Sequence, residues 1–381
     1  MRIALLSYST KPRGGVVHTL ALAEALAARG EDVTVFSLGR GGDTAFFRPI
    51  DARVKLRVVP FPEVAGEEMG PRILRSIAVL RAAFDGTAYD VVHAQDCISA
   101  NAAGRCIRTV HHLDQFTTPE LAACHERAIV TPSAHLCVSA AVAAELADGW
   151  GLKATVIPNG VDAERFAAAA GPPGEAGRQA WREELGRYVV TVGGIEPRKG
   201  SLELLEAFAL VDDPELKLVI AGGETLFDYR PYREAWDRRA AELGVTPVVL
   251  GPVDDDRLPT LVAAAETFAF PSVKEGFGLA PMEALAAGVP LVVSDLPVFH
   301  EIFGPAATYA STSEELATAL TIPVDADRRA AGQALAASYT WQAAAEAHLA
   351  FYRSLEPTGQ RTAASAAESS APKSSSSFSG E

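Results

Sequence analysis

Residues 267–293 read TFAFPSVKEGFGLAPMEALAAGVPLVV. The apolar runs at the two ends, Thr267–Phe270 and Leu291–Val293, are continuous rather than alternating, and such runs are typical of strands buried on both faces of a parallel sheet. A glycine-rich loop follows the first run, and Pro281 favours a helix start because proline is tolerated in a first helical turn. The stretch therefore predicts a strand, a helix and a second strand in parallel, which is one βαβ unit.

The same alternation of apolar runs and helical patterns extends over the rest of the chain. In the N-terminal part the expected strands are Ile3–Leu6, Val33–Phe36, Val91–His93, Thr109–Val110, Ala128–Val130 and Leu136–Val138. In the C-terminal part they are Val189–Val192, Leu218–Ile220, Val248–Leu250, Thr267–Phe270 and Leu291–Val293. We therefore predict an α/β protein with two Rossmann-like, doubly wound domains.

Composition marks the borders of these domains. The segment Ala167–Gly177 is rich in Ala, Gly and Pro and has no strand pattern, which is typical of a linker. The end of the chain is rich in Ser and Ala and has few apolar residues large enough to anchor it. The predicted organisation is an N-terminal domain over residues 1–165, a linker over 166–177, a C-terminal domain over 178–340, a last helix over 341–356 and a disordered tail over 357–381.

Charge and cysteine content exclude several classes of protein. The 381 residues carry 34 Lys and Arg against 48 Asp and Glu, a formal net charge of −14, whereas a general nucleic-acid binder needs a basic surface. Cys97, Cys106, Cys124 and Cys137 include no close pair of the kind that binds zinc or forms a redox dithiol. No signal peptide is recognisable and no apolar run is long enough for a membrane span. We expect a cytoplasmic protein without stable membrane insertion.

Two cations follow the first strand of the C-terminal domain, in Gly193-Gly-Ile-Glu-Pro-Arg198-Lys199-Gly200. The carboxyl end of a strand and the start of a helix are where open α/β sheets bind ligands, and adjacent Arg and Lys side chains suit a diphosphate. A solvated basic pair is the alternative interpretation.

The loop in residues 267–293 has the features of a second binding element. The amides of Phe277, Gly278 and Leu279 can point at an anion with the helix dipole behind them. Glu275 and Glu283 can each accept hydroxyl groups, as the diols of a sugar or a ribose require. Taken alone, Glu283 is also compatible with simple complementarity to the helix dipole.

Gly14 and Gly15 precede a helix expected from about Val16, so the backbone there can approach a ligand closely, although a tight turn explains the pair as well. The G-x-G-x-x-G pattern of dinucleotide-binding dehydrogenases is absent from this loop. The acidic run 254–256 is the one metal-like pattern, and capping of a helix near Arg257 is the interpretation that we favour.

Together these segments resemble the retaining glycosyltransferases of GT-B fold and family 4 type, the glycosyl transferases group 1. The resemblance covers the chain up to about residue 355 and rests on four features in one order. These are the Gly14-Gly15 loop, Pro158-Asn-Gly-Val-Asp162, the Arg198-Lys199 pair, and Glu275 and Glu283 with seven residues between them. It implies two domains that face each other across a cleft and a C-terminal helix that crosses back to the first domain.

The resemblance also implies roles for individual residues. Arg198 and Lys199 would bind the diphosphate and neutralise the leaving group, while Glu275 would bind donor-sugar hydroxyls and Glu283 the ribose. The remaining donor contacts would be the amides of Phe277, Gly278 and Leu279, the Gly14-Gly15 loop, and the backbone at Val253 for the base. His111 would lie near the reacting sugar, although the adjacent His112 leaves the choice between the two histidines open.

The function implied is transfer of a hexose-type sugar from a nucleotide-sugar donor to an acceptor hydroxyl, with retention at the anomeric carbon and without a metal or another cofactor. The acceptor would be a small molecule, a glycan or a lipid-linked molecule, and no nucleic acid would take part. One alternative is a sugar-nucleotide 2-epimerase of similar fold, which would need additional ionisable groups for elimination. The other is a non-catalytic nucleotide-sugar binder, against which the complete set of Arg198, Lys199, Glu275 and Glu283 counts.

Overall fold

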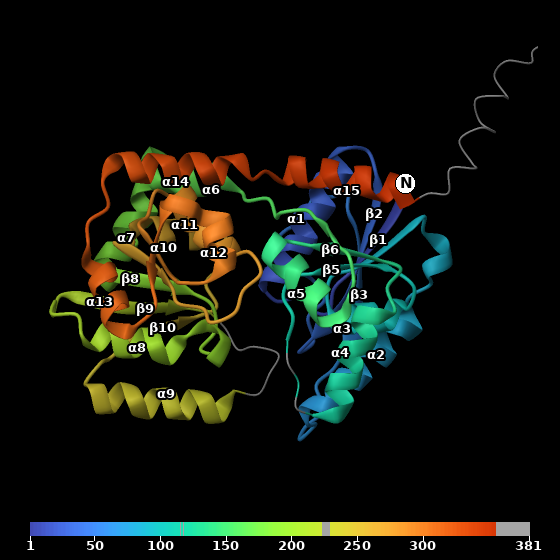
Figure 1. The fold of residues 1–381 in the computed structure, drawn as a ribbon, viewed down its shortest axis with the longest axis horizontal. Helices are drawn as coiled ribbons and strands as arrows, with labels where there is room; N and C mark the ends of the chain where they lie inside the picture. Colours follow the sequence, from blue (N-terminus) through green and yellow to red (C-terminus); the bar gives the residue numbers. More distant parts are fainter. Residues whose placement is uncertain (115, 117, 223–228, 356–381) are drawn as a thin grey trace, which may run out of the picture.

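The computed structural model describes residues 1–114, 116, 118–222 and 229–355, and Figure 1 shows two lobes, each built around one sheet. The tail over 357–381, expected to be disordered, lies outside these residues. All strand pairs in both sheets are parallel, as continuous apolar runs predict.

The sheet of the first lobe has seven strands. In spatial order they are β3 (Lys55–Phe61), β2 (Asp32–Arg40), β1 (Arg2–Leu6), β4 (Val91–Ala94), β5 (Ile107–Val110), β6 (Ala134–Cys137) and β7 (Thr155–Val156). The helices of this lobe are α1 (Gly14–Ala28), α2 (Met69–Ala83), α3 (Cys97–Ala103), α4 (Pro119–Val130) and α5 (Ala140–Trp150).

Alternation of side chains along β1 shows how helices cover both faces. Ile3 and Leu5 pack in one core with α1, while Ala4 and Leu6 pack in another with residues of α2 and α3. A strand buried on both sides needs apolar residues at every position, which is why its pattern is continuous.

The sheet of the second lobe has six strands. In spatial order they are β10 (Val248–Gly251), β9 (Leu216–Ala221), β8 (Arg187–Val192), β11 (Thr267–Phe270), β12 (Leu291–Ser294) and β13 (Ala307–Ala310). Its helices are α6 (Ala163–Ala170), α7 (Glu175–Leu185), α8 (Ser201–Ala209), α9 (Arg230–Leu243), α10 (Leu258–Ala264), α11 (Leu279–Ala286), α12 (Pro297–Phe303), α13 (Ser313–Thr321) and α14 (Ala326–Ser338). α8, α9 and α13 contribute to the core on one face, and α6, α7, α10, α11, α12 and α14 to that on the other.

The two sheets share one topology, since the strand order reverses between β1 and β4 in the first and between β8 and β11 in the second. Open α/β sheets bind ligands at the carboxyl ends of the strands where the order reverses. The loops after these four strands are therefore the places where a site is expected.

The structure corrects the predicted strand at Ala128–Val130, which forms the last turn of α4. Thr118 and Pro119 at the start of this helix are typical helix-start residues, and they outweigh three residues of apolar, β-branched character. β3, β7 and β13 were not predicted; all three are edge strands, and β7 has only two residues.

The predicted linker over 166–177 is not an unstructured connector. It contains the end of α6, a 3-10 turn at Pro172–Gly174 and the start of α7, and Phe166 is buried in the core of the second lobe. Alanine is the strongest helix former, so the Ala run continues a helix. The chain passes between the lobes earlier, between Ile157 in the first core and Val161 in the second.

The C-terminal helix α15 (Trp341–Leu355) crosses back to the first lobe, as predicted. Its Ala345, Leu349 and Tyr352 are buried in the same core as α1, and in Figure 1 α14 and α15 run along the top of both lobes. Within the described ranges, none of the helices has both the length and the apolar character that a membrane span requires.

Candidate functional site

A cavity of about 2500 Å³ lies between the carboxyl ends of the two sheets. Loops after β1, β4 and β5 line it from one lobe, and loops after β8 and β11 from the other. The structure brings all the predicted site residues to its wall: Gly14, Gly15, His111, Arg198, Lys199, Val253, Glu275, Phe277, Gly278, Leu279 and Glu283. His112 lines it too.

The centre of the C-terminal wall is an ion-pair cluster. Oε1 of Glu275 accepts hydrogen bonds from Nη1 of Arg198 at 2.6 Å and from Nζ of Lys199 at 2.5 Å. Nη2 of Arg198 also donates to Oε1 of Glu196 at 3.2 Å. Although burial favours the neutral acid, Lys199 and Arg198 lower the pKa of Glu275 to about 2. The cluster therefore holds two cations in fixed positions at the carboxyl ends of neighbouring strands.

The loops after β8 and β11 are locked together at their backbones. The N–H of Val273 donates to the carbonyl of Arg198 at 2.9 Å. Gly200 has φ of +63°, and a Cβ there would collide with the carbonyl of Pro271. Glycine is thus required for this approach, which explains the glycine beside the Arg-Lys pair.

The helix after the glycine-rich loop begins at Leu279, two residues before the expected Pro281, with Gly278 as its N-cap. No side chain caps this end, so its first amides are available to an anion. The side chain of Phe277 is buried and packs on Tyr339, with ring centroids 5.5 Å apart. Only the backbone of Phe277 can therefore take part in binding.

Glu283 lies in the second turn of α11 and also faces the cavity. Burial raises the pKa of this carboxyl group to about 7, with Arg165 acting in the opposite direction. Glu275 and Glu283 thus differ strongly in their ease of ionisation.

The acidic run 254–256 does not cap a helix through a side chain. α10 begins at Leu258 with Arg257 as its N-cap, and the carbonyl of Asp254 accepts from the N–H groups of Arg257 and Leu258. Asp255 forms an ion pair with Arg165 at 2.9 Å. The nearby arginine takes the carboxylate away from the helix end, which the sequence did not predict.

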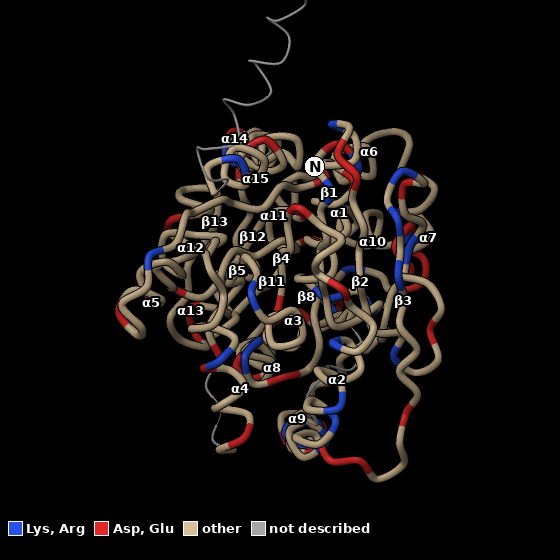
Figure 2. Tube along the Cα trace, turned by 90° about the vertical axis from the view of Figure 1, so that its right-hand side faces the viewer, with Lys and Arg blue, Asp and Glu red and all other residues tan. Residues whose placement is uncertain are grey.

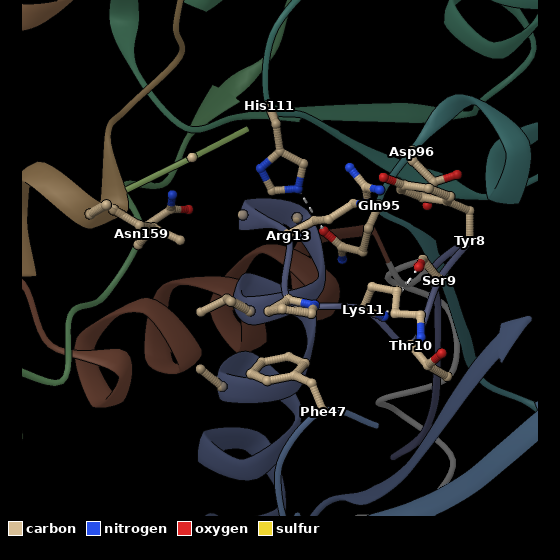
Figure 3. Close-up of a pocket in the computed structure, with 18 of the residues that line it drawn as sticks. Tyr8, Ser9, Thr10, Lys11, Arg13, Phe47, Gln95, Asp96, His111 and Asn159 are labelled. Carbon is tan, nitrogen blue, oxygen red and sulfur yellow. Dashed lines mark hydrogen bonds between the residues drawn. The ribbon is translucent and has the colours of Figure 1, made fainter. Parts of the chain in front are cut away.

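His111 points into the cavity from the end of β5. Its Nε2 lies 3.3 Å from Oε1 of Gln95, an interaction drawn in Figure 3. Because a carbonyl oxygen only accepts, Nε2 carries the proton and Nδ1 is left as an acceptor. Burial and the neighbouring His112 lower the pKa of His111 to about 3, so the ring is neutral at physiological pH.

His112 is held differently, since its Nε2 lies 3.3 Å from Oδ1 of Asp114. The ring of His111 is instead the one beside Gly15, where a Cβ would lie 3.8 Å from it. A Cβ on Gly276 would collide with the carbonyl of His111, so the two lobes touch directly beside this histidine.

Sequence reasoning missed Gln95 and Asp96, which follow β4 and line the cavity. Asp96 caps α3 by accepting from the N–H of Ser99 at 2.8 Å. A polar pair directly after an apolar strand beside β1 was the available signal. Asn159, within the Pro158–Asp162 stretch, has its Oδ1 2.8 Å from Nδ1 of His18 and is buried; it also lines the cavity.

Comparison with known proteins gives two family matches that together span most of the chain. The model for Glycosyltransferase Family 4 matches residues 12–165, and the model for Glycosyl transferases group 1 matches residues 176–322.

Individual relatives point the same way. The chain is 29% identical over 403 residues to a phosphatidyl-myo-inositol mannosyltransferase of Mycobacterium tuberculosis, covering 95% of this chain and 99% of that protein. It is 30% identical over 348 residues to a D-inositol 3-phosphate glycosyltransferase of Salinispora arenicola, covering 77% and 76%.

Solved structures show the same fold. Sucrose-phosphate synthase from Thermosynechococcus elongatus aligns with a TM-score of 0.74 at 19% identity, over 93% of this chain and 98% of that one. HepE from Anabaena, in complex with UDP and glucose, aligns with a TM-score of 0.69 at 19% identity, over 93% and 100%. The predicted GT-B arrangement is confirmed.

Proposed function

The chain belongs to the glycosyltransferases that combine a family 4 and a group 1 domain, and from this we propose that it moves a hexose-type sugar from a nucleoside diphosphate to an acceptor hydroxyl. We propose further that the anomeric configuration is retained and that no metal takes part. The four cysteines are free, which fits the reducing cytoplasm that we propose as its location.

The observation that supports this proposal most strongly is the cluster of Arg198, Lys199 and Glu275. It lies at the point where the strand order of the second sheet reverses, beside the uncapped end of α11. Departure of a nucleoside diphosphate concentrates negative charge on its phosphates, and preorganised cations and amides stabilise that charge. These side chains supply the neutralisation that a divalent cation supplies in metal-dependent transferases.

The same arrangement suggests how retention would occur. Arg198 and Lys199 hold the diphosphate on one face of the sugar, and the acceptor hydroxyl attacks on that face while a donor phosphate oxygen takes its proton. Glu275, ionised over the whole physiological range, orients the two cations and a donor hydroxyl. His111 is neutral and can accept a hydrogen bond through Nδ1 from the reacting sugar.

The relatives suggest the chemistry of the acceptor, since their names describe transfer to phosphatidyl-myo-inositol and to D-inositol 3-phosphate. We propose that a hydroxylated acceptor binds at the end of the cavity formed by the first lobe.

The donor is identified by thermal shift with UDP, GDP and ADP and their sugars, because a ligand that binds only the folded state stabilises it by mass action. Turnover is then measured as nucleoside diphosphate release in the presence of EDTA, and the product's anomeric configuration by NMR. We expect one base to be preferred, turnover with EDTA present, and retention. Conversion of the nucleotide-sugar without release of the diphosphate would indicate an epimerase instead.

A further inference from the structure

The first-lobe end of the cavity carries arginines from separate elements. Arg13 precedes α1, Arg40 ends β2, and Arg72 and Arg75 lie on α2, and all four line the cavity. In Figure 3 Arg13, the first of these arginines, lies beside Gln95 and His111.

Cations on this wall differ in their partners. Four of them are neutralised by a carboxylate: Lys11 by Asp43 at 3.0 Å, Arg48 by Glu24 at 2.6 Å, Arg53 by Asp51 at 2.6 Å and Arg75 by Glu67 at 2.6 Å. Arg40 and Arg72 take part in no ion pair within the part of the chain that the structure describes.

Arg40 is held in place by neutral groups only. Its Nε donates to the carbonyl of Tyr8 at 3.1 Å and its Nη2 to Oγ of Ser76 at 2.9 Å, and the guanidinium lies 4.9 Å from the ring centre of Phe61. Burial first, and then the charge of Arg72, lower the pKa of Arg40 to about 10, although Tyr8 and Asp96 act in the opposite direction.

Arg72 lies in the first turn of α2, where the helix dipole disfavours a positive charge. The Nε of Arg72 is buried and has no hydrogen-bond partner. One turn later, Arg75 is paired with Glu67 through two hydrogen bonds. Glu67, which is hydrogen-bonded to Arg75, also acts on Arg72 and Arg40 through its charge, but it forms no ion pair with either of them within the described residues.

We propose that Arg40 and Arg72 bind an anionic group of the acceptor, a phosphate or a carboxylate, and thereby direct an acceptor hydroxyl toward His111. This inference rests on the proposed function, because it concerns the acceptor of that reaction. A bound anion would be attracted by both guanidinium groups, and this attraction would offset the repulsion between them. Guanidinium groups bind phosphate and carboxylate through paired hydrogen bonds, which fixes orientation as well as charge.

The test uses the full chain with its cation cluster filled by a saturating nucleoside diphosphate, so that a second anion reports only on the first lobe. Calorimetric titration with inorganic phosphate is compared for wild type, Arg72→Gln, Arg40→Lys and Arg81→Gln. Arg81 is the matched control, because it lies on the same helix but does not line the cavity. Arg40→Lys keeps the positive charge but removes the paired N–H groups of the guanidinium. A loss of phosphate binding in this variant therefore does not require that the protein unfolds.

We expect one phosphate site in the wild type, with affinity reduced at least about tenfold in Arg72→Gln, as loss of a charged hydrogen bond implies. Arg81→Gln should bind as the wild type does. Absence of phosphate binding, or equal binding by Arg72→Gln, would overturn the inference. Because binding of the nucleoside diphosphate is recorded in the same samples, failure of the proposed function is recognised separately as failure of that first step.

Two further arms distinguish the source of the anion. Competition by D-inositol 3-phosphate but not by myo-inositol indicates a soluble phosphorylated acceptor. Competition by vesicles of phosphatidylcholine with phosphatidylinositol, but not by phosphatidylcholine alone, indicates a lipid headgroup. Either result supports the site, whereas equal competition by the phosphorylated and unphosphorylated inositols contradicts it.

Discussion

Glu275 in the glycine-rich loop and Glu283 in α11 differ in their ionisation because their neighbours differ. Glu275 receives hydrogen bonds from Arg198 and Lys199, and these cations lower its pKa to about 2 despite burial. Glu283 is half-buried, its carboxylate forms no hydrogen bond or ion pair within the described residues, and desolvation raises its pKa to about 7. The first is therefore ionised over the physiological range, while the second titrates within it.

This difference predicts a stability effect at Glu283. A carboxyl group whose pKa is raised on folding stabilises the fold at pH below its unfolded value of about 4.5 and loses that contribution as pH rises through about 7. We expect the free energy of unfolding to fall between pH 5 and pH 8 by up to about 3 kcal/mol, at about 1.4 kcal/mol per pKa unit. Urea unfolding of Glu283→Gln should show a smaller fall.

The control for that experiment is Glu203→Gln, because Glu203 is an exposed residue of α8. It should keep the wild-type dependence on pH. The same dependence in Glu283→Gln as in the wild type would show that burial of this carboxyl group is not its cause.

At the level of residues, the sequence predicted the positions that carry a local pattern. Arg198, Lys199, Glu275 and Glu283 lie beside glycines and at strand or helix ends, and all of them line the cavity. The side chains of Arg40 and Arg72 carry no such pattern. Their charges act on each other because Arg40 ends β2 and Arg72 lies in the first turn of α2 on one wall of the cavity, which depends on the order of the strands in space.

One contact between elements joins the two lobes beside the site. The first N–H groups of α5, those of Ala140 and Ala141, donate to the two carboxylate oxygens of Glu301 in α12 at 2.7 Å and 2.9 Å. Lys274 and Glu145 form a second contact at 3.3 Å. A helix end in one lobe is thus capped by a carboxylate of the other, which stabilises this arrangement of the two lobes.

Removal of this cap should weaken donor binding without disturbing either lobe. Loss of a helix cap costs about 1 kcal/mol, so Glu301→Ala should raise the dissociation constant of the donor nucleotide about fivefold. Calorimetry measures this change, and Glu314→Ala on the exposed side of α13 is the control. Unchanged affinity in Glu301→Ala would mean that this contact between the lobes does not contribute to donor binding.

Strand prediction worked where runs are apolar on both faces and was less successful elsewhere. β1, β8, β11 and β12 match their predicted runs to within two residues at either end. β3 is an edge strand with exposed Lys55, Leu56 and Arg57, so it lacks a continuous apolar pattern. The short apolar run at the end of α4 gave the opposite error. It was predicted to be a strand because a helix can end with the same residue types that form strands.

At the scale of the whole molecule, the lobes are joined by two chain crossings that lie side by side. The N–H of Val161 donates to the carbonyl of Tyr339 at 2.8 Å. A Cβ on Gly160 would collide with the backbone of Trp341, where α15 begins. The absence of a side chain at Gly160 therefore allows the crossings to pack together.

We expect Gly160→Ala to lower the free energy of unfolding by about 1–3 kcal/mol, as overpacking of a close contact does. Chemical denaturation measures the loss. Gly149→Ala is the matched control, because nothing lies within 4 Å of a Cβ at that position in α5. Equal stability of Gly160→Ala and the wild type would show that the crossings move apart freely.

The net charge of the whole molecule bears on the class of protein but not on the site. The value of −14 argued only against a general nucleic-acid binder, and Figure 2 shows acidic and basic positions mixed along the chain trace in that view. It contains no information about the cavity, where pairing of individual charges decides which cations remain available. The facing of two sheets, and hence the cavity itself, followed only from the family resemblance and not from composition.

The proposed reaction depends above all on Arg198 and Lys199, which stabilise the departing diphosphate. This role is tested by the rate of nucleoside diphosphate release from the preferred donor, with acceptor and EDTA present, in Lys199→Ala against the wild type. The control is Lys217→Ala, an exposed lysine of β9 that does not line the cavity. We expect a rate at least about 100-fold lower in Lys199→Ala, since loss of one preorganised donor has that effect, and an unchanged rate in Lys217→Ala. Release by folded Lys199→Ala at the wild-type rate would contradict it.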